Sequence, residues 1–470
     1  MTRLPILQAE PQAPVLPHVS PTLGGQKRIW VDTYGCQMNE HDTQRMIGLM
    51  AEEGYLPTPD MDLADLLIIN SCSVREKAEN KLRSAAGRLK HVKKARPGAV
   101  IALAGCVAQQ EGASLLTRVP HADLVLGPDH VTRLPELVRR IQNDRVRLNE
   151  TTFVERDDYV FPRLTEAAPV ETIAYVSIMK GCDKFCSFCI VPMTRGRESC
   201  RDAEEIVREV QSLAARGTKE VVLLGQTVNT YGARKVHGEI PFHELIARIA
   251  DVDGIERIRF TSPHPADFSD AQIRAFRDVP KLCPHMHLPV QSGSTRVLQA
   301  MRRGYTREDY IALVDRFREM APNAALSTDI IVGFPSETEA EFEETLSLME
   351  HVRFDQAYSF AYSERTGTRA ATLEEGVVPL EDRRRRLATL QALQDRHTQA
   401  RLQSMVGRRY SVLVEGVSKS NPNRSSGRTD TNRVVHMEGQ LSPGIVVTVD
   451  IIEAYAHSVL AVLAPPALAY

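Results

Sequence analysis

The most constraining feature of this chain is a unit that occurs three times near its N-terminus: an apolar run, a cysteine and a stretch with helical spacing. The apolar runs RIWVDTYG, ADLLIIN and GAVIALAG lead into Cys36, Cys72 and Cys106. The cysteines are 36 and 34 residues apart (72 − 36 and 106 − 72), about one βαβ unit each. Parallel strands end at one edge of their sheet, where open α/β sheets bind ligands. We therefore expect an N-terminal open parallel α/β sheet domain on which the three thiols, the dispersed triad, converge.

A second cysteine triad is compact. Cys182, Cys186 and Cys189 form a C-x3-C-x2-C motif directly after the apolar run AYVSIMKG. Three thiolates are one fewer than a closed structural metal site needs, so each triad could hold a metal or an iron–sulfur cluster with one position open for chemistry. Alternatives remain open: zinc at the compact triad, and three buried structural cysteines in place of the dispersed one.

Six apolar runs from residue 174 to residue 362 alternate with helical patterns, over 174–182, 220–226, 257–262, 285–291, 325–334 and 354–362. This alternation predicts a partial (β/α)6 barrel, because a complete barrel would need two more units. From Tyr410 the runs become short and β-branched and are separated by turn residues, which predicts a small all-β barrel. The predicted boundaries are a disordered leader over 1–26 and domains over 27–144, 168–402 and 403–466, with a linker from about 144 to 168.

Composition narrows the class of protein. The formal net charge of −2 excludes a uniformly basic nucleic-acid binder, but it leaves room for local basic patches. The leader lacks a targeting pattern, and no apolar stretch reaches the roughly 20 residues of a membrane span. Cysteines grouped in triads in a chain without a secretory signal indicate a reducing, cytoplasmic compartment and no membrane partner. Cys200 and Cys283 belong to neither triad and are expected to be buried small residues.

The motifs CDKFCSFC, TRGRE, LLGQTVNTYG, HLPVQSGS and STDIIVGFPSETE resemble those of the radical S-adenosylmethionine (SAM) enzymes, and within them the methylthiotransferases. RRGYT and GRTDTNRVV are similar to segments of the MiaB-type branch that modifies tRNA. The resemblance covers residues from about 27 to 465. It implies that the central domain is a radical SAM barrel and that the C-terminal module is a TRAM domain, a small barrel that binds RNA.

The resemblance also implies two [4Fe–4S] clusters and SAM as cofactors. One cluster is held by Cys36, Cys72 and Cys106 and carries the sulfur to be inserted. The other is held by Cys182, Cys186 and Cys189, and its open iron binds SAM and cleaves it to a 5′-deoxyadenosyl radical. Segments expected around SAM contribute Phe188, Gly225, Gln226, Gln291, Ser292, Asp329, Gly333 and Glu337.

The implied activity is the addition of a methylthio group to C2 of N6-(dimethylallyl)adenosine at position 37 of tRNA. The expected partners are a tRNA anticodon stem-loop, an electron donor such as flavodoxin or ferredoxin, and a sulfur donor, and a monomer is expected. Phosphate contacts are expected from Arg408, Arg409, Lys419, Arg424, Arg428 and Arg433. Rival hypotheses are a methylthiotransferase for threonylcarbamoyl-adenosine in tRNA or for a ribosomal-protein aspartate, and a non-catalytic iron–sulfur RNA-binding protein.

Overall fold

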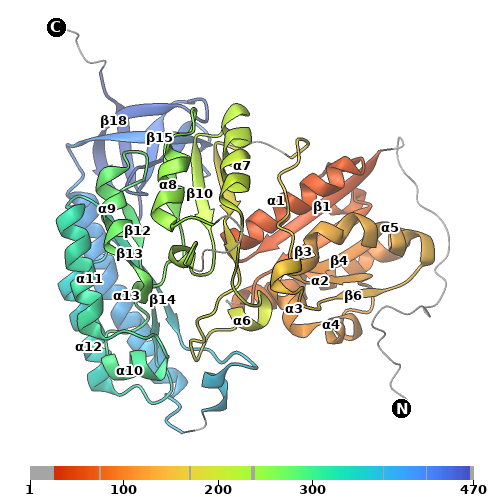
Figure 1. Ribbon diagram of the computed structural model, residues 1–470, viewed down its shortest axis with the longest axis horizontal. Coiled ribbons are helices and arrows are strands. Elements are labelled where there is room, and N and C mark those ends of the chain that lie inside the picture. Colours follow the sequence, from red (N-terminus) through yellow and green to blue (C-terminus); the bar gives the residue numbers. More distant parts are fainter. Residues whose placement is uncertain are drawn as a thin grey trace. The chain divides into compact units, whose positions relative to one another are not determined.

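The computed structural model describes residues 26–73, 76–168, 171–233, 239–373, 375–419 and 421–465 (Figure 1). These residues form two compact units. The first holds the described residues up to Ala168 together with Met179–Lys184 and Cys189–Arg201, and the second holds the remainder. Apart from Gln26, the predicted leader lies outside the described residues.

The first unit contains a six-stranded sheet in which all neighbouring strands are parallel. In spatial order its strands are β2 (Tyr55–Pro57), β1 (Lys27–Tyr34), β3 (Leu66–Ser71), β4 (Val100–Ala104), β5 (Leu124–Leu126) and β6 (Leu148–Glu150). β3 and β4 are buried throughout, as parallel strands covered on both faces are. The prediction of an open parallel α/β sheet is confirmed.

Helices connect these strands: α1 (Gln37–Glu52), α2 (Glu76–Ala95), α3 (Cys106–Glu111), α4 (Ala113–Arg118) and α5 (Leu134–Asp144). The third predicted helix is in fact two short ones, since Gly112 between them has φ +52°. The predicted linker is corrected at one point. β6 lies within it and pairs with β5, so the sheet continues to Glu150.

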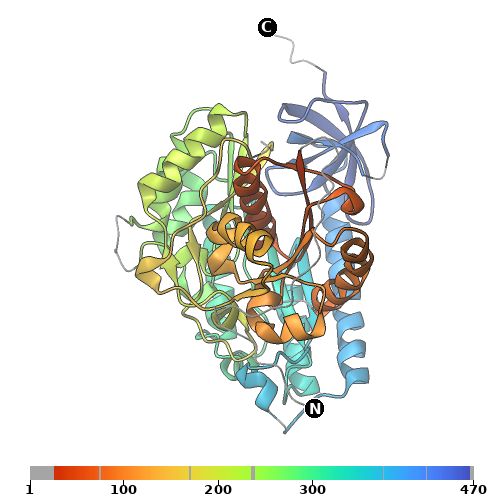
Figure 2. The same ribbon diagram turned by 90° about the vertical axis from the view of Figure 1, so that its right-hand side faces the viewer.

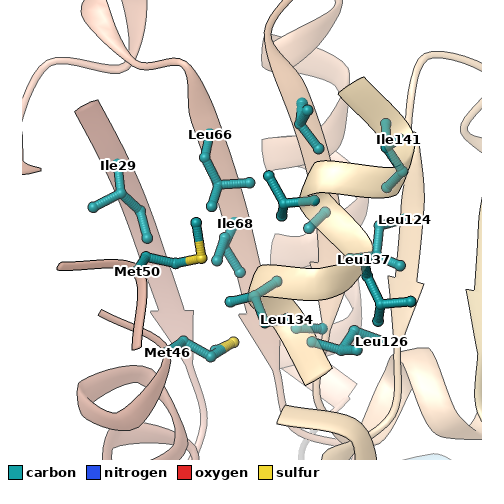
Figure 3. Close-up of a cluster of buried hydrophobic side chains, with 14 of the residues drawn as sticks. Ile29, Met46, Met50, Leu66, Ile68, Leu124, Leu126, Leu134, Leu137 and Ile141 are labelled. Atoms are coloured by element: carbon teal, nitrogen blue, oxygen red, sulfur yellow. The ribbon is translucent and has the colours of Figure 1, made fainter. Parts of the chain in front are cut away.

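Two apolar cores cover the two faces of the sheet. Figure 3 shows one of them, in which Met46 and Met50 from α1 and Leu134, Leu137 and Ile141 from α5 pack against side chains of β1, β3 and β5. Every residue that the figure labels is at least 95% buried. At roughly 1.5–3 kcal/mol for each fully buried side chain, this core contributes much of the stability of the sheet that carries the three cysteines.

Three short elements after β6 also belong to the first unit. They are β8 (Met179–Lys180), β9 (Ser199–Cys200), which pairs antiparallel with β8, and α6 (Val191–Thr194). Lys180 is buried with its Nζ 2.6 Å from Asp129 Oδ1 and 3.7 Å from the ring centroid of Tyr159. The segment on both sides of the compact triad therefore packs on the N-terminal sheet domain.

The second unit contains the six predicted parallel strands in two three-stranded sheets. One is β11 (Arg257–Phe260), β10 (Glu220–Leu224) and β7 (Ile173–Ser177), and the other is β12 (His285–His287), β13 (Ala325–Val332) and β14 (Gln356–Ala361). A parallel bridge from Ile258 to Leu282 continues the series between the two sheets. The predicted partial (β/α)6 barrel is confirmed.

The barrel helices are α7 (Ala203–Ala215), α8 (Phe242–Ala250), α9 (Asp270–Asp278), α10 (Thr295–Ala300), α11 (Arg307–Met320), α12 (Glu339–Val352) and α13 (Leu380–Gln403). Several begin where the sequence supplies a cap. Ser269, Thr306 and Thr338 each form a capping box with the residue three positions on.

The C-terminal module is a closed five-stranded barrel in the order β15 (Arg409–Val417), β16 (Arg424–Thr429), β17 (Val434–Glu438), β19 (Val459–Leu463) and β18 (Val446–Ala454). It is drawn in dark blue in Figure 2. Arg259 of β11 fastens it to the rest of the second unit. Its guanidinium binds Glu220 at 2.9 Å and donates to the carbonyl oxygens of Thr429 and Asp430. Among the described helices, none is both long enough and apolar enough to cross a bilayer.

Candidate metal centres

The dispersed triad lies at one edge of the first unit's sheet. Cys36 follows the end of β1 by two residues, Cys72 follows β3 directly, and Cys106 follows β4 by two. β1, β3 and β4 are neighbours, and residues at their ends pair in register, Tyr34 with Ser71 and Asn70 with Ala104. The structure therefore brings together the three cysteines that the sequence leaves 70 residues apart (106 − 36).

Two glycines allow this close approach. Gly35 and Gly105 precede Cys36 and Cys106, with φ values of +146° and +92°. A Cβ on Gly35 would lie 2.3 Å from the Cβ of Cys72, and one on Gly105 would lie 2.3 Å from Asn70 Oδ1. Any side chain at these positions would force the three loops apart.

The three thiols contact one another, with Cys72 in the middle. Hydrogen bonding with Cys72 lowers the pKa of Cys36 to about 7 and that of Cys106 to about 6. The same contacts raise the pKa of Cys72 well above its ordinary value. Cys72 and Cys106 are buried and Cys36 is partly exposed. Thiolates, not thiols, bind metals, so these contacts favour the ligand form at two of the three positions.

A buried polar network holds the loops of the triad. Asn39 Nδ2 donates to Asn70 Oδ1 at 2.9 Å, and Asn70 Nδ2 donates to the Asn39 carbonyl at 2.8 Å and to Thr43 Oγ1 at 3.0 Å. Asn39 Oδ1 also accepts from the Cys36 thiol at 3.4 Å. These bonds tie the start of α1 to the end of β3 and fix the positions of Cys36 and Cys72.

Arg195 places a buried positive charge beside the dispersed triad. Its side chain is buried beside Asp42 of α1, with Nη2 2.8 Å from Asp42 Oδ2, and it hydrogen-bonds the Cys106 thiol. Sequence reasoning missed Arg195, Asp42 and the asparagine network. The motif TRGRE contains Arg195, but its position after the compact triad gives no sign of a contact with the dispersed one.

The compact triad lies on a loop whose parts belong to both units. In the first unit, Cys182 is buried and its sulfur accepts the Lys184 N–H at 3.3 Å. In the second, Cys186 is buried and its sulfur accepts from Arg303 Nη1 at 3.4 Å. Arg303 is also buried and donates to the Pro289 carbonyl, a positioning role that sequence reasoning missed although RRGYT contains this residue.

The donors present fit an iron–sulfur cubane. In the part of the chain that the structure describes, no three His, Cys, Asp or Glu side chains surround one point as the ligands of a single metal ion would. A cubane needs a different arrangement, with one thiolate on each of three irons. Three neighbouring thiols from three separate loops match that donor set.

The residues expected around SAM fall into two groups. Gln226 is half-buried, and its Oε1 has no hydrogen-bond partner among the described residues, which is typical of a group that meets a ligand. Phe188 is half-buried and packs against the apolar cluster that contains Val297 and Met301. Asp329 is half-buried with Oδ2 3.4 Å from His287 Nε2.

The second group consists of residues that shape strand-to-helix turns. Gln291 has φ +74° and forms a backbone bridge with Ile330. Ser292 is fully buried, and its Oγ accepts from the Ser294 N–H at 3.2 Å. Glu337 accepts from the Gly333 N–H and from Arg386 at 2.8 Å, and burial raises its pKa. Gly225, in the loop after β10, is buried.

The six basic residues expected to contact RNA are not equivalent. Arg408 and Lys419 are exposed. Three others pair with carboxylates of the same barrel: Arg409 with Asp450, Arg424 with Glu438 and Arg428 with Glu415.

The prediction for Arg433 is wrong. This side chain is buried and is bound to the carboxylate and the carbonyl of Asp355, so it holds the small barrel in place instead of facing solvent. Of the two remaining cysteines, Cys283 is buried as expected, whereas Cys200 is partly exposed.

One face of the sheet formed by β12, β13 and β14 carries polar and aromatic side chains. Asp329 and Tyr358 pair in register, and His287 lies near both, with Nε2 3.4 Å from Asp329 Oδ2 and its ring 5.9 Å from the Tyr358 ring. Tyr358 and Phe360 are 42% and 38% exposed, although both lie on a barrel strand. β14 is the edge strand of its sheet and none of its residues is fully buried, so the two rings offer an accessible apolar surface that suits a planar ligand.

Comparison with known proteins agrees with this architecture. Family models match residues 28–127 ("Uncharacterized protein family UPF0004"), 176–349 ("Radical SAM superfamily") and 403–464 ("TRAM domain"). A solved radical SAM methyltransferase, TsrM from Kitasatospora setae, has the same fold with a TM-score of 0.52. It is 14% identical, and the match covers 74% of each chain.

Two relatives match over almost their full length. The tRNA-2-methylthio-N(6)-dimethylallyladenosine synthase of Myxococcus xanthus is 48% identical, with 94% of this chain and 96% of the relative covered. The synthase of the same name from Syntrophus aciditrophicus is 46% identical, with 92% and 94% covered.

The fold and the cysteine triads thus define a radical SAM enzyme with a C-terminal TRAM domain, and such an enzyme uses SAM and [4Fe–4S] clusters. The sequence identity to the two relatives then identifies a particular family within this class of enzymes. The chain belongs to the family of tRNA-2-methylthio-N(6)-dimethylallyladenosine synthases.

Proposed function

We propose that this enzyme adds a methylthio group to C2 of N6-(dimethylallyl)adenosine at position 37 of tRNA. The observation that carries the proposal is the meeting of Cys36, Cys72 and Cys106 at the ends of three neighbouring strands, in a chain that has a second triad at the start of a radical SAM barrel. A single triad would suffice for radical chemistry alone. The additional one supports sulfur insertion.

Each triad holds one [4Fe–4S] cluster in this proposal. Cys36, Cys72 and Cys106 bind the first, and Cys182, Cys186 and Cys189 bind the second. The bound cofactors supply one-electron cleavage of SAM and a transferable sulfur, which an adenine C2–H bond needs because it has no leaving group and little acidity. The protein's own residues orient the ligands, exclude water and place charges.

Gln226 and Phe188 are the best supported SAM contacts. Gln226 offers a buried acceptor without a partner among the described residues, and Phe188 offers an aromatic face beside the compact triad. Asp329 is accessible from the same sheet face as Tyr358. Gln291, Ser292, Gly333 and Glu337 support SAM indirectly, because their polar groups already close the turns at the strand ends.

The aromatic face of β14 is a suitable wall for the target base. Base–aromatic stacking contributes about 1–3 kcal/mol per base, and a flipped adenine with an apolar substituent would cover both Tyr358 and Phe360. His287 and Asp329 provide polar groups on the same face. Exposure of both rings supports this role, because an aromatic face must be accessible to stack on a base.

The remaining partners follow from the reaction. Arg408 and Lys419 of the TRAM domain can contact the phosphates of the anticodon stem-loop. The reaction also needs an electron donor such as flavodoxin or ferredoxin and a sulfur donor, and we place it in the cytoplasm with the enzyme as a monomer.

Anaerobic reconstitution and nucleoside analysis test the proposal. The full-length chain should bind about eight irons, and replacing either triad with alanine should leave about four. Mass spectrometry of tRNA from a deletion strain should show loss of the 2-methylthio group from N6-(dimethylallyl)adenosine. Loss of the group from threonylcarbamoyl-adenosine, or from a ribosomal-protein aspartate, would contradict the substrate assignment. Absence of SAM cleavage with dithionite would favour a non-catalytic RNA-binding protein.

A further inference from the structure

Arg195 is an unusual residue to find buried at the dispersed triad. It is the sixth residue after Cys189, yet its side chain contacts residues of the N-terminal sheet domain within the first unit. The residue is only 5% exposed. An arginine is almost never buried to this extent unless it is paired, because desolvating its charge is costly.

Arg195 lies near two helices that begin at or directly after a cysteine of the dispersed triad. α1 begins directly after Cys36 and contributes Asp42, whereas α3 begins at Cys106. α6, which ends immediately before Arg195, packs against α3 (Figure 1). The guanidinium therefore contacts Asp42 in the second turn of α1 and Cys106, the first residue of α3.

The guanidinium has one carboxylate partner and two thiol neighbours. It pairs with Asp42, with Nη2 2.8 Å from Oδ2. It also hydrogen-bonds the Cys106 thiol and interacts electrostatically with Cys36. A buried guanidinium beside two of the three ligand thiols is therefore placed to act on the charge of this site.

We infer that Arg195 is a positioning residue that holds a positive charge against the cluster of the dispersed triad and raises its reduction potential. The inference depends on the proposed function, because that function places a [4Fe–4S] cluster on these cysteines. Three thiolates make such a site negative, and its potential depends on net charge and on hydrogen bonds to sulfur. In a buried site these charges are screened less than at the surface. Asp42 should have the opposite effect on the potential.

The experiment measures this potential directly. The full-length chain with Cys182, Cys186 and Cys189 replaced by alanine is reconstituted anaerobically, so that only the dispersed triad is loaded. It is titrated with dithionite, which adds one electron per cluster, while the reduced form is followed by electron paramagnetic resonance. Arg195→Met should lower the ratio of reduced to oxidised cluster at a fixed potential about tenfold or more, a shift of about 59 mV for a one-electron couple.

Two further variants test the direction of the shift in reduction potential. Asp42→Asn should shift the potential upward, because it removes a neighbouring negative charge. Arg195→Lys should shift it downward by less than half as much as Arg195→Met, because the charge remains while the planar fork is lost. If Arg195→Met takes up no iron, the other two variants still provide the test.

Arg303 offers a matched control at the compact triad, since its Nη1 lies 3.4 Å from Cys186 Sγ. In chains that carry only the compact cluster, Arg303→Met should shift the potential and Arg195→Met should leave it unchanged. Equal potentials for the wild type and Arg195→Met at the dispersed triad would overturn the inference. The inference would also be overturned if Arg195→Met and Asp42→Asn shifted the potential in the same direction. Loss of iron from both Arg195→Met and Arg195→Lys would overturn it as well. Failure of the parent chain to bind iron at the dispersed triad would instead contradict the proposed function.

Discussion

Replacing Gly105 with alanine should destabilise the N-terminal sheet domain and disrupt the dispersed triad. Gly105 has φ +92° and ψ −161°, a region that is essentially restricted to glycine. A Cβ here would lie 2.3 Å from Asn70 Oδ1, 2.7 Å from the Ser71 carbonyl oxygen and 2.9 Å from Asn39 Nδ2. The new methyl group would therefore push against the network that positions Cys36 and Cys72.

The expected loss of stability has two parts. Backbone strain at this conformation costs about 1–3 kcal/mol. Overpacking against groups that cannot move freely adds about 1–3 kcal/mol. Gly105→Ala should therefore cost about 2–6 kcal/mol, a large fraction of the ~5–15 kcal/mol that stabilises a typical domain.

The chain provides both a local probe and a matched control. Trp30, its single tryptophan, lies in β1, so tryptophan emission during urea unfolding reports on the N-terminal sheet domain. Gly54 has φ +81°, but a Cβ added there would meet no heavy atom within 4 Å. Gly54→Ala thus introduces strain without overlap and should cost about 1–2 kcal/mol. Losses for the two variants that agree within about 0.5 kcal/mol would refute the steric argument.

Three further predictions concern the second unit. Tyr358→Ala should raise the KM for the tRNA substrate about 5- to 150-fold, because it removes the ~1–3 kcal/mol of base stacking. SAM cleavage should continue, and Tyr358→Phe should retain most of the affinity. An unchanged KM would exclude the base from this face. Arg259→Met should destabilise the second unit by about 3–5 kcal/mol in calorimetry because it leaves Glu220 buried without its ion pair, whereas a change below about 1 kcal/mol would mean that the pair is dispensable. Replacing Arg408 and Lys419 together with alanine should weaken tRNA binding and reduce the slope of log affinity against log salt by about 1–2, and an unchanged slope would exclude both from phosphate contact.

Elements with strong, long patterns are the ones that can be predicted from the sequence. β3 and β4 are continuous apolar runs, and their repeated position before a cysteine predicts the convergence that the structure shows. β5 and β6 are three residues each, too short for a pattern to distinguish them from a loop. The sequence pattern around β6 consequently predicts a linker where the structure has a strand.

The errors at the candidate site have a different cause. A basic residue in a β-rich module suggests solvent exposure, but Arg433 is buried because Asp355, 78 residues away along the chain, pairs with it. The role of Arg195 escapes sequence reasoning for the same reason, since its partner Asp42 lies far away in the sequence. Long-range ion pairs leave no local periodicity, so only the folded chain reveals them.

The burial of Arg195 beside Cys106 sets an order for biosynthesis. The sheet that carries the three thiols is synthesised first, and residue 195 follows about 90 residues after Cys106, which takes roughly 4–18 s at ~5–20 residues per second. During this interval the nascent thiols lack their buried cation and are open to premature oxidation or to the wrong metal. Under the proposed function, delivery of iron to this triad is therefore expected to follow translation of the segment that carries Arg195.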